Sequence, residues 1–386
     1  MKTIILSANT SWYLYNYRAS TIRALLGGGY RVVCLSPGDA YSARLEALGA
    51  EWMVLRIDNQ GSNPFADAGL WWRLFRVYRL LRPVLVFHFT LKNNVYGTWA
   101  ARLAGIPAVN IISGLGTAFI RTGFVPAVAR LLYRLSQPLA RVVYCQNEED
   151  YSLLVAHGIV PERRLRRLPG SGVDLARYAM GRWEARRVGE PFRFLYAGRM
   201  LADKGLYELM EALAVLNRDG LRATLTLCGF SEVDNVSAIP SEVLEVWKRR
   251  PDVHWLGPRD DMEQVYAQSD CMVLPSYREG LPKGLLEAAA MGLPLVATDV
   301  PGCRQVVRHG VNGLLCAPRD ARALELALAE MLEMSEERRG AMGAAGRAFV
   351  ESHYDEQQVV REALAVVEEV LGERSHHIAH GFNRGL

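Results

Sequence analysis

The sequence predicts an α/β protein in which two doubly wound parallel sheets follow one another along the chain. At 386 residues the chain is too long for one hydrophobic core, and about two domains are expected. Short apolar segments alternate with segments whose apolar residues recur three and four positions apart, a pattern typical of parallel sheets covered by helices. The alternation is interrupted by a polar stretch rich in Arg and Gly at residues 174–190. We therefore place one domain at residues 1–180 and a second at residues 181–354.

The expected strands form two series. In the first domain they are residues 3–6, 31–35, 52–55, 84–89, 108–112 and 142–145. In the second domain they are residues 192–197, 223–228, 253–256, 271–274 and 295–298. Segments with helical periodicity separate them, and a last helical segment, 355–373, follows the second domain. Because parallel strands end at one edge of a sheet, the side chains that follow these strands are the first candidates for a binding site.

Composition and charge exclude several classes of protein. Lys plus Arg 45 against Asp plus Glu 41 gives a net charge of 45 − 41 = +4, too small an excess to indicate a nucleic-acid-binding protein. A hydrophobic content of 50% and a charged content of 22% exclude a disordered or fibrous chain. The six cysteines form no C-x-x-C pair and are expected to be buried thiols in a reducing compartment. With neither a secretory signal nor a long apolar run, we expect a cytoplasmic protein that does not span a membrane.

The most informative loop is P-S-Y-R-E-G-L-P-K-G-L-L-E, at residues 275–287. A bend at Gly280 and Pro282 would bring Glu279 beside the start of the next helix, where Glu287 lies one turn in. Two carboxylates at one end of the sheet suit sugar hydroxyls, and the free amides of a helix start suit a phosphate. Taken alone, the pattern equally fits a helix start with an acidic first turn.

A second loop, G-R-M-L-A-D-K-G at residues 198–205, places two cations at the same edge of the sheet. Arg199 and Lys204 can neutralise a diphosphate without a metal, since each charge-assisted hydrogen bond contributes roughly 1.5 to 3 kcal/mol. No Asp-x-Asp follows a strand to hold a divalent ion, and Asp260-Asp261 is interpreted as an N-cap and first-turn pair. The two loops together point to a bound diphosphate that carries a sugar.

These motifs resemble the retaining GT-B glycosyltransferases of family 4 over nearly the whole chain. The patterns G-R-x-L-x-x-K-G, E-G-x-P-x-x-x-x-E, M-G-L-P and G-V-N-G-L-L occur in order in the second domain. The resemblance implies two Rossmann-like domains facing across a cleft, with the terminal segment 355–386 crossing back to the first domain. It also implies a transferase whose co-substrate is a nucleotide sugar, expected to be a UDP-sugar, with no other cofactor and no metal.

The resemblance assigns roles to individual residues of the second domain. Arg199 and Lys204 would bind the diphosphate, Glu279 the transferred sugar, and these three would be the catalytic residues. Glu287 would bind the ribose. The further donor-binding residues would be Gly198, Gly280, Leu281, Pro282 and Gly257, the last near the nucleobase. The implied mechanism is a front-face displacement in which the leaving diphosphate takes the acceptor proton, and a double displacement through Glu279 stays open.

The first domain carries weaker signals for the acceptor. The acceptor-side residues that the resemblance implies are Asn16, Arg18, Thr90, Lys92, Ser113 and Gly114. Many relatives have His-Gly where Ser113-Gly114 stands here, so no essential histidine is assigned at that position. His88 lies inside an expected strand and is interpreted as a packed residue.

The motifs T-x-K-x-N, I-S-G-L-G and S-Y-R-E-G-L-P resemble a branch that extends polyprenyl-diphosphate-linked saccharides in bacterial glycan, capsule or O-antigen assembly. Residues 70–82 contain an arginine at every third position and no acid, as expected of a helix that touches anionic lipid. A helix packed on the sheet with solvated arginines explains them equally well. A lipid-linked diphosphate acceptor would also explain Lys92 and the basic cluster R-R-L-R-R at residues 163–167.

We therefore expect a glycosyltransferase that moves a hexose or N-acetylhexosamine from a UDP-sugar to a polyprenyl-diphosphate-linked saccharide at the inner face of the plasma membrane. Three alternatives stay open: a soluble transferase with a small acceptor, a nucleotide-sugar 2-epimerase, and a sugar-binding protein without activity. The epimerase would need acid and base carboxylates with a histidine in the cleft. The binding protein is disfavoured because both cations and both glutamates are present.

Overall fold

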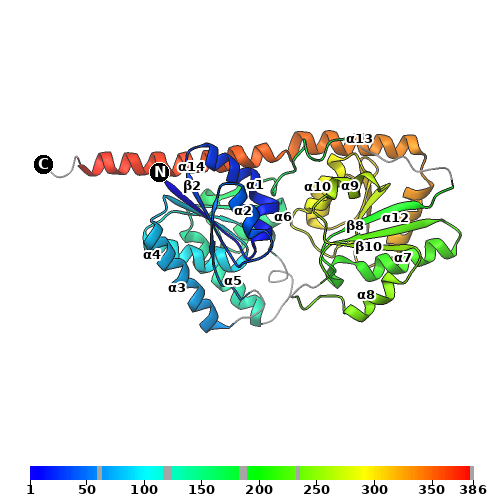
Figure 1. Cartoon of the computed structure of the whole chain (residues 1–386), viewed down its shortest axis with the longest axis horizontal. Helices are drawn as coiled ribbons and strands as arrows, with labels where there is room; N and C mark the ends of the chain where they lie inside the picture. Colours follow the sequence, from blue (N-terminus) through cyan, green and yellow to red (C-terminus); the bar gives the residue numbers. More distant parts are fainter. Residues whose placement is uncertain (59–62, 116–123, 182–188, 232–234, 383–386) are drawn as a thin grey trace. The chain divides into compact units, whose positions relative to one another are not determined.

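The computed structural model describes residues 1–58, 63–115, 124–181, 189–231 and 235–382, and divides the chain into two compact units (Figure 1). Unit 1 comprises Met1–Ser171 together with Glu356–Leu386, and unit 2 comprises Gly172–Asp355. The boundary predicted at residues 180–181 therefore falls inside unit 2. Part of the polar stretch used to place it, residues 182–188, lies outside the described residues, as do residues 383–386 of the predicted tail.

Unit 1 is built on a parallel sheet of seven strands in the order β3-β2-β1-β4-β5-β6-β7. The strands are β1 (Thr3–Ser7), β2 (Arg31–Ser36), β3 (Glu51–Val54), β4 (Leu85–Phe89), β5 (Ala108–Ile111), β6 (Val142–Cys145) and β7 (Leu165–Arg167). The order reverses between β1 and β4, and in such a sheet ligands bind beyond the carboxyl ends of the strands at this reversal. The six predicted strands are confirmed. Strand β7 was not predicted, because its residues Leu-Arg-Arg carry no apolar run.

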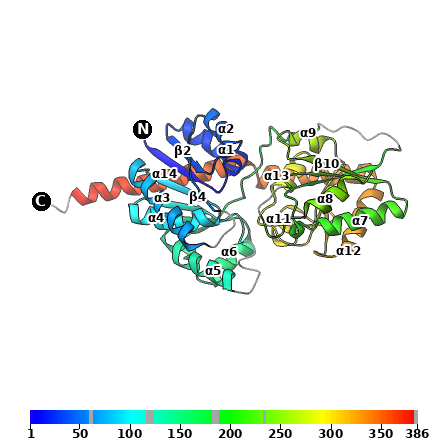
Figure 2. The same cartoon turned by 60° about the horizontal axis from the view of Figure 1, so that its bottom comes forward.

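Helices cover both faces of this sheet (Figures 1 and 2). They are α1 (Ser11–Gly27), α2 (Ser42–Ala47), α3 (Pro64–Leu81), α4 (Thr98–Ala104), α5 (Phe124–Ser136), α6 (Glu148–Ala156) and α14 (Glu356–Phe382), with a π-helical turn, η1 (Asn93–Gly97), before α4. Local sequence explains two of the starts. The Thr10 side chain accepts a hydrogen bond from the Tyr13 amide at the start of α1, and Asn63 accepts one from the Phe65 amide before Pro64 opens α3.

The C-terminal helix α14 packs in unit 1, which confirms the predicted return of the chain to its first domain. Val366, Val367 and Val370 are buried in the same core as strands β1 and β4. Two polar contacts also connect the helix to the sheet. The Tyr144 hydroxyl donates to Glu362 over 2.8 Å, and the Arg166 guanidinium pairs with Glu369 over 2.8 Å. Among the described residues, no helix is both long and apolar enough to cross a bilayer.

Unit 2 contains a second parallel sheet, of six strands in the order β10-β9-β8-β11-β12-β13. The strands are β8 (Phe192–Ala197), β9 (Ala223–Cys228), β10 (Val253–Gly257), β11 (Cys271–Leu274), β12 (Leu295–Thr298) and β13 (Gly313–Cys316). The helices around them are α7 (Leu206–Arg218), α8 (Ser241–Lys248), α9 (Met262–Ala267), α10 (Lys283–Ala290), α11 (Pro301–Val306), α12 (Ala321–Glu333) and α13 (Glu336–His353). The five predicted strands are confirmed, and β13 is a strand that was not predicted. The strand order reverses between β8 and β11, so the loops after these two strands occupy the expected binding position.

Candidate active site

The two motif loops of unit 2 meet at this reversal point. The first, residues 198–205, follows β8, and the second, residues 275–282, follows β11, which is hydrogen-bonded to β8. Their backbones are in contact: the Tyr277 amide donates to the carbonyl of Asp203 over 2.9 Å. Gly205 has φ +71° and approaches Pro275 so closely that a Cβ atom would lie 2.0 Å from the Pro275 carbonyl oxygen. Only glycine fits at position 205.

Glu279 and Lys204 form an ion pair where the two loops meet. Their side chains are 12% and 18% exposed, so both charges are largely withdrawn from water. The Ser276 hydroxyl donates to the same carboxylate oxygen, Oε1, over 2.6 Å. Two donors therefore fix the orientation of Glu279, and a carboxylate has further lone pairs that can accept from a hydroxyl of a ligand.

The start of α11 supports the backbone of Glu279. The Gly302 amide, in the first turn of α11, donates to the Glu279 carbonyl over 3.2 Å. A Cβ atom on Gly302 would lie 2.5 Å from the Gly280 carbonyl oxygen, so this contact also requires glycine. The backbone of Glu279 and Gly280 is thus held by the first turn of α11, which follows β12.

Arg199, the other predicted cation, lies in the loop after β8 with an exposed side chain. Its backbone is fixed, because the buried Tyr196 hydroxyl donates to the Arg199 carbonyl over 2.8 Å. Burial raises the pKa of Tyr196 well above its usual value, so this phenol stays protonated and able to donate. The Arg199 carbonyl is thus held in place, and its exposed side chain is accessible to a ligand.

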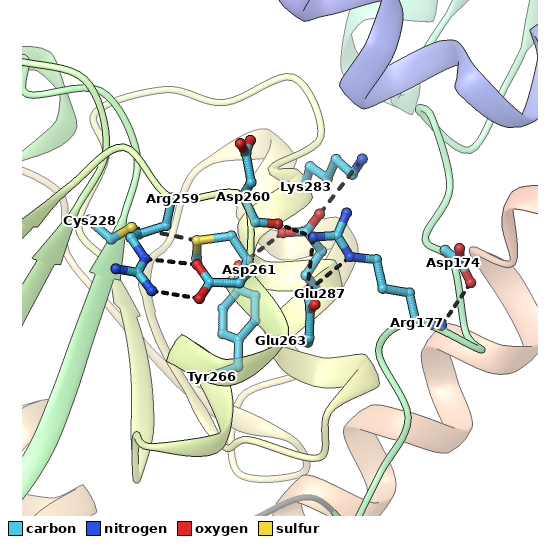
Figure 3. A network of polar contacts seen from close by, with 11 residues as sticks. Asp174, Arg177, Cys228, Arg259, Asp260, Asp261, Glu263, Tyr266, Lys283 and Glu287 are labelled. Atoms are coloured by element: carbon cyan, nitrogen blue, oxygen red, sulfur yellow. Dashed lines mark hydrogen bonds and ion pairs between the residues drawn. The ribbon is translucent and has the colours of Figure 1, made fainter. Parts of the chain in front are cut away.

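Glu287 lies in α10, one turn beyond the loop, and is buried (Figure 3). The Tyr266 hydroxyl, from α9, donates to its Oε2 over 3.0 Å, and the Lys283 ammonium lies 3.6 Å from its Oε1. The Tyr178 ring packs edge-on against the Tyr266 ring with the centroids 5.9 Å apart. Burial and then the Glu287 charge raise the pKa of both tyrosines, which therefore remain neutral donors beside the carboxylate.

Arg177 links the segment that enters unit 2 to the loop after β10 (Figure 3). Its Nε donates to Glu263 over 2.9 Å, and its Nη2 donates to the Asp260 carbonyl. The neighbouring Asp261 occupies the N-cap position of α9, but its carboxylate makes no capping hydrogen bond and instead pairs with Arg259 over 2.5 Å. The pair expected to supply an N-cap and a first-turn residue is thus shifted by one position: Asp261 is the N-cap residue, and Arg259 occupies its carboxylate.

The predicted glycines Gly198 and Gly257 lie along neighbouring strand ends. The Gly198 amide donates to the Cys228 carbonyl, and the Gly229 amide donates to the Gly257 carbonyl, each over 2.9 Å. Gly229 has φ +144°, and a Cβ atom there would lie 1.9 Å from the Gly198 carbonyl oxygen. Backbone therefore packs on backbone along this edge, and no side chain projects from it at these positions.

Four residues of this arrangement were not predicted: Ser276, Tyr266, Tyr178 and Arg177. Ser276 lies inside the motif loop, three residues before Glu279, so its proximity in the sequence was a usable signal. Tyr266 and Tyr178 are indistinguishable from core residues in the sequence, since only the fold brings their hydroxyls to Glu287. Leu281 and Pro282, predicted as donor-binding residues, precede α10, and because proline has no amide hydrogen, Pro282 cannot donate a backbone hydrogen bond to a nucleotide sugar.

The acceptor-side candidates of unit 1 fall into separate groups. Arg18 is only 2% exposed, and its guanidinium lies over the Phe89 ring at 4.6 Å. The Tyr13 hydroxyl bonds with the Ser113 hydroxyl over 2.9 Å and accepts from Arg18 over 3.4 Å, so Tyr13 joins two of the predicted residues. Asn16 donates to the carbonyl of Trp12 within α1.

The segment after β4 turns sharply and carries another two candidates. Thr90 has φ 70°, a left-handed conformation that is uncommon for a β-branched residue. Lys92 pairs with Asp67 of α3 over 2.7 Å, and both side chains are largely buried. Gly114, at φ 124°, follows β5. The Lys92 ammonium thus has an anionic partner inside unit 1, which the sequence alone did not indicate.

His88 is packed inside the sheet, in agreement with its interpretation. Its Nδ1 bonds with the Asn110 side chain over 2.9 Å and its Nε2 with the Tyr78 hydroxyl over 2.8 Å. Burial lowers the pKa of His88 to about 4, so the ring is neutral at physiological pH. Both ring nitrogens are engaged by protein groups, which leaves His88 a structural role.

The basic cluster 163–167 is bound within unit 1. Arg164 donates to the carbonyls of Pro138 and Ala140, Arg166 pairs with Glu369, and Arg167 pairs with Glu148 over 2.7 Å. These three arginines therefore have partners inside unit 1, which the sequence alone did not indicate. Across the part of the chain that the structure describes, no three His, Cys, Asp or Glu side chains are grouped closely enough to hold a metal ion.

Comparisons with known proteins give one family match in each unit. Residues 16–170 match the family described as Glycosyl transferase 4-like domain, and residues 191–334 match the family described as Glycosyl transferases group 1. The second match contains every predicted donor-binding residue from Gly198 to Glu287. The two matches together extend over most of the chain.

Individual proteins are similar to this chain over much or nearly all of its length. An N,N'-diacetylbacillosaminyl-diphospho-undecaprenol alpha-1,3-N-acetylgalactosaminyltransferase of Campylobacter jejuni is 27% identical over 373 residues, which cover 93% of this chain and 96% of the relative. A UDP-Gal:alpha-D-GlcNAc-diphosphoundecaprenol alpha-1,3-galactosyltransferase of Escherichia coli is 26% identical over 260 residues, which cover 64% of this chain and 66% of the relative. The crystal structure of Anabaena HepE in complex with UDP and glucose superimposes with a TM-score of 0.76 at 18% identity, covering 96% of this chain and 100% of that chain.

Proposed function

Because this chain belongs to the GT-B glycosyltransferases, with a 4-like domain followed by a group 1 domain, we propose that it transfers a hexose or N-acetylhexosamine from a UDP-sugar to a polyprenyl-diphosphate-linked saccharide. The single observation that carries the donor half of this proposal is the ion pair of Lys204 with Glu279 at the reversal point of the unit 2 sheet. It holds a cation for a diphosphate next to a carboxylate for sugar hydroxyls.

In the proposed reaction, Arg199 and Lys204 bind the diphosphate of the donor and stabilise the negative charge that develops as the bond to the anomeric carbon breaks. The acceptor hydroxyl forms the new glycosidic bond on the same face, and its proton passes to the leaving diphosphate. Glu279 accepts hydrogen bonds from the sugar. The Oε1 atom of Glu279 already accepts from Lys204 and Ser276. These two hydrogen bonds lower the nucleophilicity of the carboxylate and therefore favour direct displacement over a double displacement through Glu279.

Glu287 is proposed to hold the ribose of the nucleotide. Its buried carboxylate is oriented by Tyr266, and both diol hydroxyls of a ribose can donate to one carboxylate. The name of the Anabaena structure gives UDP as its ligand, and this supports uridine as the nucleoside of the donor. The leaving group is proposed to depart without a metal, since two cations of the chain are placed to take its charge.

The proposed acceptor follows from the relatives, whose names specify undecaprenyl-diphosphate-linked saccharides. Two helices of unit 1 support it. On α3 the side chains of Arg73, Arg76 and Arg79 are exposed, as is that of Arg82, which follows the helix. On α5, Leu131 and Leu135 are 53% and 55% exposed, one turn apart on the same face. Cations and exposed leucines of this kind are typical of a surface that rests on an anionic membrane, here proposed to be the cytoplasmic face of the plasma membrane.

A donor and acceptor matrix tests the proposal. The purified chain is incubated with UDP-glucose, UDP-galactose and their N-acetyl forms, each with and without a polyprenyl-diphosphate-linked N-acetylhexosamine, and released UDP and the product lipid are measured. We expect one UDP-sugar to be consumed rapidly only with the lipid acceptor, and the product anomer, assigned by NMR, to retain the donor configuration. Turnover with no acceptor, giving an isomer of the donor, would instead identify an epimerase.

A further inference from the structure

An aromatic pocket lies in unit 1 between α3 and the start of α4, apart from the residues assigned to the donor. It measures about 330 Å³ and is lined by Pro64, Asp67, Ala68, Trp71, Tyr96 and Trp99. Pockets for small ligands begin at about 300 Å³, so this one can hold a small molecule or a short part of a larger one. The helices that form its walls lie side by side in both views (Figures 1 and 2).

The charged residue in the lining, Asp67, already accepts hydrogen bonds from protein groups. Asp67 accepts from the Lys92 ammonium through Oδ1 over 2.7 Å and from the Tyr96 hydroxyl through Oδ2 over 2.8 Å. The Tyr96 and Trp99 rings stand edge to face with the centroids 5.8 Å apart, which fixes one wall. What the pocket offers a ligand is therefore mainly aromatic and aliphatic surface, which suits a hydrocarbon and provides few hydrogen-bond partners for the hydroxyls of a sugar.

The topology places this pocket at the carboxyl edge of the unit 1 sheet. Its residues come from the first two turns of α3, which follows β3, and from η1 and the first turn of α4, which follow β4. Lys92 connects the pocket to the segment after β4 that contains Thr90, one of the proposed acceptor-side residues. A ligand whose polar end lies near Thr90 can therefore place its apolar end in the pocket.

The exposed arginines of α3 indicate that the ligand carries a negative charge. Beyond Trp71 the exposed residues Arg73, Arg76 and Arg79 follow at every third position, and the helix contains no acid after Asp67. An apolar pocket at the start of a helix whose later turns carry exposed cations is complementary to an amphiphile with an anionic head. We propose that the aromatic pocket binds the first isoprene units of the prenyl chain of the acceptor, next to its diphosphate; this inference rests on the proposed function.

Farnesyl diphosphate provides a soluble probe of the chain and head together, and inorganic pyrophosphate provides the head alone. Titration calorimetry with the full chain should show that farnesyl diphosphate binds more tightly than pyrophosphate. Trp99→Ala should weaken farnesyl diphosphate binding by about tenfold, the loss expected when about two buried methylene groups are re-exposed. The affinity for pyrophosphate should not change.

Two matched variants keep the test independent of folding. Ala68→Trp adds bulk at an exposed position of the lining and should block the probe without removing any packed side chain. Trp72→Ala removes a tryptophan from the same helix that is 51% exposed and does not line the pocket, and it should leave binding unchanged. Equal weakening by Trp72→Ala and Trp99→Ala, or full binding by Ala68→Trp, would overturn the proposal.

Competition experiments separate the remaining occupants. Displacement of farnesyl diphosphate by dihexanoyl phosphatidylglycerol at equal concentration would reassign the pocket to membrane acyl chains, and displacement by methyl glucoside would reassign it to a sugar. Failure of the proposed function is a different result. If farnesyl diphosphate binds as described but no UDP-sugar is transferred to a prenyl-linked saccharide, the prenyl-binding pocket is supported and the proposed transferase function is contradicted. If Ala68→Trp transfers the sugar as fast as the unchanged chain, the role of the pocket is contradicted and the proposed transferase function is not.

Discussion

Lys204 and Glu279 lie 75 residues apart in the sequence and form a largely buried ion pair at the reversal point of the unit 2 sheet. The pair exists because β8 and β11 are hydrogen-bonded neighbours whose following loops pack against each other. Its chemical consequence is that a cation for phosphate and an acceptor for hydroxyls occupy one site with fixed geometry.

Loss of either cation should impair the chemical step. We expect Arg199→Ala and Lys204→Ala each to lower kcat/KM by on the order of 10²-fold, equivalent to about 3 kcal/mol of transition-state stabilisation. Steady-state release of UDP measures the effect. Arg218→Ala, which removes an exposed arginine of α7 in the same unit, is the matched control and should be neutral. Near-normal turnover in both site variants would show that the diphosphate binds elsewhere.

The hydrogen bond from Tyr266 to Glu287 should affect donor binding more than the chemical step. Tyr266→Phe keeps the ring that packs on Tyr178 but removes the hydroxyl that orients the carboxylate. Because a hydrogen bond to a charged group contributes about 1.5 to 3 kcal/mol, we expect the KM for the UDP-sugar to rise about tenfold or more. The kcat should change little, and Tyr207→Phe, on the exposed side of α7, should change neither constant. A drop in kcat with an unchanged KM would contradict a role at the ribose.

Chelation of divalent ions should leave the activity largely intact. The reason is that Arg199 and Lys204 are placed to take the charge of the leaving diphosphate, a task that a divalent ion performs in many other transferases. The rate of UDP release is compared in buffer, in excess EDTA, and in EDTA followed by Mn²⁺. Activity that disappears with EDTA and returns with Mn²⁺ would reveal a metal ion whose role these two cations do not fill.

Removal of helix α14 should destabilise unit 1. Deleting residues 356–386 exposes the core that Val366, Val367 and Val370 cover and leaves Arg166 without Glu369. We expect a lower Tm for a thermal transition of unit 1, followed by tryptophan fluorescence. A shorter deletion, of residues 373–386, retains these valines and is the control. The prediction fails if the two deletions give the same Tm as the full chain.

The arginines of α3 should mediate part of the attachment to membranes. Each cation near an anionic surface contributes about 1 kcal/mol, and salt weakens this attraction. Replacing Arg73, Arg76, Arg79 and Arg82 by Gln should reduce sedimentation with phosphatidylglycerol vesicles at low salt, whereas replacing the exposed Arg218 and Arg249 of unit 2 should not. Equal binding to neutral vesicles would assign attachment to apolar side chains such as Leu131 and Leu135. Binding to neither type would favour a soluble acceptor.

Much of the fold could be predicted because it depends on short-range patterns. The apolar runs of β1 and β8 and the helical spacing between strands follow from burial on a sheet covered by helices, and each is visible within a few residues. The two strands that were not predicted show the limit of such patterns. In β7 the residues Leu165–Arg167 are mostly charged, and they form a strand only because the edge of β6 offers hydrogen bonds.

The amino-acid sequence by itself determined the α/β class, the two sheets, the loops that carry Arg199, Lys204, Glu279 and Glu287, and the likeness to family 4. Tertiary structure decided which of these side chains meet. Sequence patterns report local conformation and burial, whereas strand order and contacts between distant residues result from the packing of the whole unit. For this reason three contacts became visible only in the folded chain. They are the hydrogen bond from Tyr266 to Glu287, the ion pair of Lys92 with Asp67, and the ion pair of Arg166 with Glu369 of α14.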